Sequence, residues 1–129
     1  MPILIVEDNR ASGKILEINL RNNGYATLVV RNGRQALECL QSTPDIELVI
    51  TDIMMPEMNG LELLRAMKEH AEWKEIPVIM STVIADSETV KKAAGMGCRE
   101  YLAKPIIPAQ LIQKVRKALE DKRVILQSK

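Results

Sequence analysis

Aromatic side chains are scarce in this sequence of 129 residues, which contains no phenylalanine, one tryptophan and two tyrosines. Proteins that bind single-stranded nucleic acid stack its bases on aromatic rings, so this class is disfavoured. An excess of one charge is also lacking, because 18 lysines and arginines oppose 17 aspartates and glutamates, and direct nucleic-acid binding is not expected. No apolar run approaches the roughly 18–20 residues that cross a bilayer, so we expect no membrane contact.

Cysteine and histidine are too few and too scattered for a disulfide framework or a zinc site. Cys39 and Cys98 stand far apart, and His70 is the single histidine. This usage predicts reduced, buried thiols in a cytoplasmic protein. The opening stretch 1–6 lacks the basic lead of a signal peptide, which supports the same location. Glycine-rich phosphate loops are missing as well, so a bound nucleotide fits the sequence poorly.

Short apolar runs alternate with helical patterns five times along the chain. Strands are predicted at residues 3–6, 25–30, 47–52, 77–82 and 100–103, and each is followed by a helix. This alternation predicts an α/β fold, with a five-stranded parallel sheet in a three-layer αβα sandwich with five helices. The first, third and fourth runs are the most apolar, so we expect them at the centre, in the flavodoxin-like order 2-1-3-4-5.

The predicted domain spans residues 1–122, and residues 123–129 are interpreted as a C-terminal extension that either lengthens the last helix or begins a linker. In the first helix, the apolar face is expected to include Ala11, Ile15 and Ile18. The helix between about residues 86 and 97 has few large apolar side chains. Two interpretations of it stay open: an element that shifts during function, or small residues that allow close packing.

Chemically useful side chains stand at the ends of the predicted strands. Glu7 and Asp8 follow the first strand, Asp52 ends the third, Thr82 ends the fourth and Lys104 follows the fifth. Because the carboxyl ends of parallel strands meet at one edge of a sheet, we expect these side chains to lie together. Three neighbouring carboxylates repel one another unless a cation joins them, and oxygen ligands in this number favour Mg²⁺, or Mn²⁺ in its place.

A cation, a lysine, a hydroxyl group and a carboxylate together suit a phosphoryl group, and Asp52 is the candidate nucleophile. Each residue alone also has a purely structural explanation. An acid at a strand end often caps a helix, and Lys104 or Thr82 alone would be an ordinary surface or turn residue. The convergence of five such residues on one edge favours the phosphoryl site.

Four segments of the sequence resemble the receiver domains of bacterial two-component response regulators, of the chemotaxis-regulator type, over about residues 2–122. The most specific is the run from Asp52 to Gly60, which has the pattern D-x-x-M-P-x-M-x-G. The others are Ile5-Val6-Glu7-Asp8, Pro77-Val78-Ile79-Met80-Ser81-Thr82 and Tyr101-Leu102-Ala103-Lys104-Pro105. The resemblance implies a phosphorylation switch in a phosphorelay rather than an enzyme, with self-phosphorylation and self-dephosphorylation as its only reactions.

In that family pattern, Asp52 would accept a phosphoryl group from the phosphohistidine of a sensor histidine kinase or a histidine phosphotransfer protein. Asp8, Asp52 and the backbone carbonyl of Met54 would bind Mg²⁺ directly, and Glu7 would act largely through water. Lys104 would bind the phosphoryl oxygens, and its peptide bond to Pro105 would be cis.

The same resemblance implies that the signal leaves through Thr82 and Tyr101. Thr82 would move to hydrogen-bond the phosphoryl group, and Tyr101 would turn inward behind it. The downstream protein or output domain stays unknown, and whether the chain acts alone or belongs to a longer protein stays open. Dimerisation after phosphorylation, through the last two helices, is a further expectation.

Three departures from the family pattern affect these expectations. Glu7 replaces the commoner Asp, and Val83 stands where a small residue is usual. Met54 and Ile84 place apolar side chains beside the phosphoryl group, where they cannot orient an attacking water, so a long-lived phosphorylated state is predicted. Val83 leaves open a pseudo-receiver that binds proteins without phosphorylation. A Mg²⁺-dependent phosphohydrolase is a second alternative, although its D-x-D pattern is absent because Met54 follows Asp52 by two residues.

Overall fold

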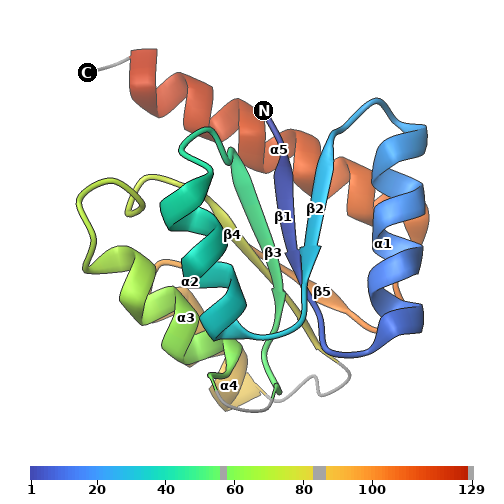
Figure 1. Cartoon of the computed structure of the whole chain (residues 1–129), viewed down its shortest axis with the longest axis horizontal. Coiled ribbons are helices and arrows are strands. Elements are labelled where there is room, and N and C mark those ends of the chain that lie inside the picture. Colours follow the sequence, from blue (N-terminus) through green and yellow to red (C-terminus); the bar gives the residue numbers. More distant parts are fainter. Residues whose placement is uncertain (56–57, 83–86, 128–129) are drawn as a thin grey trace.

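The computed structural model describes residues 1–55, 58–82 and 87–127, and it places five parallel strands in one sheet (Figure 1). The order β2-β1-β3-β4-β5 confirms the predicted topology. Every residue of β1, β3 and β4 is buried, which confirms that the most apolar runs are central. The strands are β1 (Ile3–Val6), β2 (Thr27–Val30), β3 (Leu48–Asp52), β4 (Val78–Thr82) and β5 (Glu100–Ala103).

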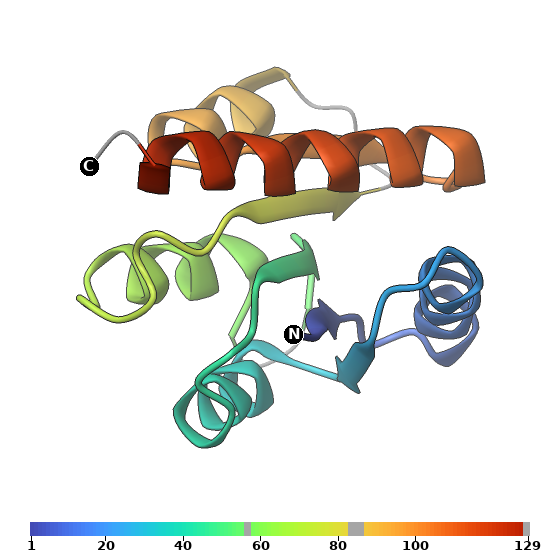
Figure 2. The ribbon, with the colours of Figure 1, turned by 90° about the horizontal axis from the view of Figure 1, so that it is seen from above.

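Helices cover both faces of this sheet, as the predicted three-layer sandwich requires. Alternate residues of a strand point to opposite faces, so β1 supplies Leu4 to one core and Ile5 to the other. The core around Ile5 is covered by α1 and α5, and the core around Leu4 by α2, α3 and α4. Figure 2 shows the strands passing between α1 on one side and α2 and α3 on the other. The helices are α1 (Arg10–Asn22), α2 (Gly33–Ser42), α3 (Gly60–Lys68), α4 (Ser87–Gly95) and α5 (Pro108–Gln127).

Three helices begin in the same way, with an asparagine whose side chain caps the free backbone N–H groups of the first turn. Asn9 accepts a hydrogen bond from the N–H of Ser12, at 3.0 Å. Asn32 and Asn59 cap α2 and α3 in the same manner. These caps fix where each helix starts, and Asn9 lies directly after the Glu7-Asp8 pair that follows β1.

The predicted apolar face of α1 is wrong. Ile15 and Ile18 are 49% and 47% exposed, whereas Gly13, Leu16 and Leu20 are buried against the sheet. Both sets of residues have helical spacing, so periodicity alone does not choose between them. The choice comes from the sheet, because Leu16 and Leu20 belong to the core that α1 and α5 share.

The C-terminal helix α5 continues to Gln127, which agrees with the interpretation that the tail lengthens the last helix. The proposed domain boundary at residue 122 stays a prediction. No helix in the described part of the chain combines the length and the apolar character that crossing a membrane requires. Between Glu88 and Gly95 of α4, Ala93 is the one buried residue, so both interpretations of this helix remain open.

Candidate functional site at the carboxyl edge of the sheet

The five candidate residues reach one edge of the sheet, as predicted from the strand ends. All strands run in the same direction, so their carboxyl ends lie together (Figure 1). Asp52 pairs with Ser81 in the register of β3 and β4, and Thr82 pairs with Ala103 in that of β4 and β5. The backbone N–H of Lys104 donates to the carbonyl of Thr82, at 2.8 Å, which extends the ladder to the lysine.

The acidic residues form a compact cluster. One carboxylate oxygen each of Glu7, Asp8 and Asp52 lies within 4.8 Å of the others. Glu7 is 3% exposed and Asp52 is 9% exposed, whereas Asp8 faces solvent. Oxygen donors with one open side suit a hard cation that keeps some of its water, so the residues present fit Mg²⁺.

Lys104 joins the two buried carboxylates of the cluster. Its Nζ lies 2.6 Å from Oε2 of Glu7 and 3.0 Å from Oδ2 of Asp52, although Glu7 and Lys104 are 97 positions apart in the chain. Burial raises the pKa of Glu7 above its ordinary value, against the lowering effect of the hydrogen bond from Lys104. Burial alone would lower the pKa of Lys104, but its hydrogen bonds to Glu7 and Asp52 outweigh it and raise that pKa.

Backbone contacts hold the Asp52 carboxylate and the loop that follows it. The N–H of Met54 donates to Oδ1 of Asp52, at 3.3 Å. A Cβ on Gly60 would stand 2.3 Å from the carbonyl oxygen of Asp52, so only glycine lets α3 begin this close to β3. The N–H of Gly60 also donates to the carbonyl of Ile53, at 2.9 Å. Gly60 is thus a positioning residue for the site.

The two residues predicted to carry the signal lie on the strands that follow β3 in the sheet, Thr82 on β4 and Tyr101 on β5. Thr82 is 2% exposed at the end of β4. Tyr101 pairs with Met80 in the sheet, and its hydroxyl oxygen is buried without a hydrogen-bond partner among the described residues. The predicted roles of both residues in signalling stay predictions.

Three further expectations concern the Lys104–Pro105 peptide bond, the two cysteines, and the residues Val83 and Ile84. The Lys104–Pro105 peptide bond is cis, as expected. Cys39 and Cys98 are unpaired, but they are only partly buried. Val83 and Ile84, two of the departures from the family pattern, lie outside the described residues.

The sequence reasoning missed the direct contact between Glu7 and Lys104, because it assigned Glu7 to bound water and Lys104 to phosphoryl oxygens. It also missed the close approach of Gly60 to Asp52. The Asn59-Gly60 pair, a turn signal directly before the helix, could have indicated it.

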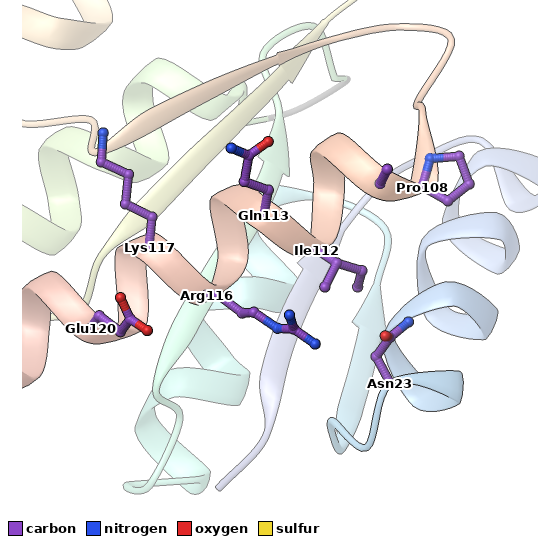
Figure 3. Close-up of a pocket in the computed structure, with 8 residues that line it drawn as sticks. Asn23, Pro108, Ile112, Gln113, Arg116, Lys117 and Glu120 are labelled. Atoms are coloured by element: carbon purple, nitrogen blue, oxygen red, sulfur yellow. The ribbon is translucent and has the colours of Figure 1, made fainter.

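A hollow of about 630 Å³ lies away from this edge, along α5 and near Asn23 at the end of α1 (Figure 3). Arg116 extends toward Asn23, whereas Lys117 leaves the helix on the other side, where its Nζ lies 3.5 Å from Oε2 of Glu100. This hollow contains none of the acidic cluster, so its size does not identify it as the functional site.

The chain is similar to known proteins over most of its length. The family model for the response regulator receiver domain matches residues 3–116. The polar-differentiation response regulator DivK of Brucella anthropi is 35% identical over 123 residues, which cover 92% of this chain and 96% of DivK. A two-component response regulator of rice, ORR7, is 33% identical over 84% of this chain, and the match spans 52% of ORR7.

Among solved structures, a putative response regulator from Chloroflexus aurantiacus superposes with a TM-score of 0.88 at 29% identity, over 93% of this chain and 99% of that one. The fold, the acidic cluster with its lysine and the match over most of the chain lead to one conclusion. This chain belongs to the receiver domain family of two-component response regulators, whose members are phosphorylation-based signalling modules.

Proposed function

We propose that this chain is a phosphorylation-activated switch in which Asp52 accepts a phosphoryl group from the phosphohistidine of a partner kinase or phosphotransfer protein. The observation that carries the proposal is the contact of Lys104 with Asp52, at 3.0 Å, beside the carboxylates of Glu7 and Asp8. A nucleophile, a fixed cation and a set of metal ligands therefore meet in one place. In this proposal, the chain's reactions are its own phosphorylation and dephosphorylation.

In the transfer step, an oxygen of Asp52 attacks phosphorus, and an O–P bond forms while the P–N bond to the donor imidazole breaks. The electron pair of the broken bond stays on the imidazole nitrogen. Mg²⁺ bound by Asp8, Asp52 and the Met54 carbonyl would neutralise charge on the phosphoryl oxygens. Lys104 already lies against Asp52, so a small movement away from Glu7 brings its ammonium group onto a new phosphoryl oxygen.

The exposed apolar surface beside the site supports a protein donor. A hollow of about 370 Å³ is lined by Lys104 together with Ile15 of α1 and Pro105. Ile15 and Ile18 are about half exposed, as is Ile107 after β5. Exposed apolar residues next to a reactive group are typical of a surface that a partner covers. The donor protein is proposed to dock on α1 and on the segment after β5.

Phosphorylation would then act on Thr82 of β4 and Tyr101 of β5, the two strands that follow the Asp52 strand in the sheet. New negative charge on Asp52 attracts the Thr82 hydroxyl, and a shift of Thr82 changes the space available to the Tyr101 ring. The downstream partner is a protein or an output domain that reads this change. Dimerisation through α4 and α5 after phosphorylation remains a separate proposal.

One assay tests the phosphoacceptor. The protein is incubated with Mg²⁺ and acetyl phosphate or phosphoramidate, and its intact mass is measured. A single added phosphoryl group is expected in the wild type and in Asp45→Asn, a control at an exposed aspartate, but not in Asp52→Asn. Absence of the adduct would favour the pseudo-receiver, and turnover of phosphoesters would favour a hydrolase.

A second assay tests the donor surface. Ile15→Glu should reduce transfer from a phosphohistidine protein that labels the wild type, while labelling by acetyl phosphate stays unchanged. Leu28→Glu is the matched control, because Leu28 is also exposed but lies on the edge strand β2. Equal loss of transfer in both variants would contradict the proposed surface.

A further inference from the structure

Met54 differs from the other methionines of the chain in its exposure next to Asp52. Its side chain is 62% exposed, whereas Met67 and Met80 are fully buried. Met55, Met58 and Met96 are partly buried against the core. Met1 is 69% exposed, but it precedes β1 and therefore lies at the opposite end of the sheet from the site.

The backbone of Met54 is hydrogen-bonded to the side chain of Asp52. The backbone nitrogen of Met54 lies 3.3 Å from Oδ1 of Asp52. The Cα is bonded to this nitrogen, so the side chain of Met54 starts close to the carboxylate. Methionine is unbranched and flexible, which lets its sulfur reach groups around that carboxylate. The Met54 side chain therefore starts beside the carboxylate that would carry the phosphoryl group, and its length allows the thioether to reach that group from the solvent side.

We propose that Met54 is a reversible oxidation site that sets the lifetime of phosphorylated Asp52. This inference rests on the proposed function of Asp52. The oxidant is a hydroperoxide: the Met54 sulfur attacks the peroxide, an S–O bond forms and the O–O bond breaks. With hydrogen peroxide the other oxygen leaves as water, so sulfur loses two electrons and peroxide gains two. Methionine sulfoxide reductases reverse the change.

Oxidation changes the hydrogen-bonding capacity of the Met54 side chain next to phosphorylated Asp52. The thioether is apolar and keeps no water in an attacking position, whereas the sulfoxide oxygen accepts hydrogen bonds. A water held by that oxygen gains orientation toward phosphorus. One added hydrogen bond of ordinary strength predicts dephosphorylation about fivefold faster.

The experiment oxidises the protein before phosphorylating it. Wild type and Met54→Leu are treated with dilute hydrogen peroxide, reduced with dithiothreitol to restore cysteines, desalted, and phosphorylated with acetyl phosphate and Mg²⁺. Loss of the phosphoryl group is followed by intact mass, and peptide mapping locates each sulfoxide. We expect Met54 to oxidise well before Met67, dephosphorylation of the oxidised wild type to accelerate about fivefold, and reductase treatment to restore the original rate.

Met54→Leu still carries Met1, so it reports oxidation far from the site, and its dephosphorylation should not respond to peroxide. Acceleration of the same size in Met54→Leu would overturn the proposal. It would also be overturned by an unchanged rate in wild type whose Met54 is mapped as sulfoxide, or by oxidation of Met54 no faster than that of Met67. Failure of every sample to become phosphorylated would instead overturn the proposed function, and this inference with it.

Discussion

The ammonium group of Lys104 lies closer to Glu7 than to Asp52, at 2.6 Å against 3.0 Å. Both oxygens of Glu7 are engaged, because Oε1 accepts the N–H of Asn9 at 3.2 Å. Glu7 thus holds Lys104 in addition to lying within the acidic cluster.

Glu7→Gln should make folding stability less sensitive to pH in metal-free buffer. Burial raises the pKa of Glu7 above 4.5, so the folded state binds a proton more tightly than the unfolded state. Stability therefore falls as pH rises from 4.5 through the raised pKa, and the full cost is present above it. The free energy of unfolding of Glu7→Gln minus that of wild type should grow across this window, measured by urea unfolding with a chelator present. If this difference in the free energy of unfolding did not change with pH, the raised pKa of Glu7 in the folded state would be contradicted.

Lys104→Met should destabilise the metal-free protein at neutral pH by about 3 kcal/mol, because it leaves two buried carboxylates without their cation. Mg²⁺ should recover part of this loss by taking over the neutralisation. Lys117→Met is the control, since Lys117 is 64% exposed beside Glu100 and should change stability by less than about 1 kcal/mol. Thermal unfolding with and without Mg²⁺ measures both. Equal losses in the two variants would argue against a buried ion cluster.

Gly60→Ala should destabilise the fold by about 2 kcal/mol or more and slow phosphorylation, because the new Cβ would collide with the backbone of Asp52. Gly95→Ala is the matched control. A Cβ at Gly95 meets nothing within 4 Å, and alanine favours helix by up to about 1 kcal/mol at such a position. Urea unfolding and acetyl phosphate labelling of both variants provide the comparison. A neutral Gly60→Ala would show that α3 can move away from β3 without cost.

Tyr101→Phe should stabilise the unphosphorylated protein by about 1 kcal/mol, since it removes a buried hydroxyl that has no hydrogen-bond partner among the described residues. For a domain of this size the unfolding midpoint should rise by about 3–5 °C. Tyr25→Phe is the control, because Tyr25 packs against the core around Ile5, which α1 and α5 cover. This substitution should shift stability by less than about 0.5 kcal/mol. A lower stability of Tyr101→Phe would contradict this prediction. It would mean that the hydroxyl makes a hydrogen bond whose contribution exceeds the cost of burying the hydroxyl.

The sequence by itself determined the topology and the edge of the sheet at which the candidate residues meet. Apolar runs at β1, β3 and β4 end on Glu7-Asp8, Asp52 and Thr82, and parallel strands bring such ends together whatever the details of packing. The predicted starts of three strands, at residues 25, 47 and 77, were one or two residues early, because the structure starts them at 27, 48 and 78. A run of apolar residues does not mark the first ladder hydrogen bond.

Only the tertiary structure decided which face of α1 is buried and which partner Lys104 takes. Ala11, Ile15 and Ile18 compete with Gly13, Leu16 and Leu20 on equal helical spacing, and the sheet buries the second set. The contact of Lys104 with Glu7 joins residues 97 positions apart and depends on side-chain conformation in a buried site. Local pattern carries the information for strands, helices and their caps. Burial and pairing between distant side chains depend on the assembled core. The contact of Lys104 with Asp52 therefore required the tertiary structure.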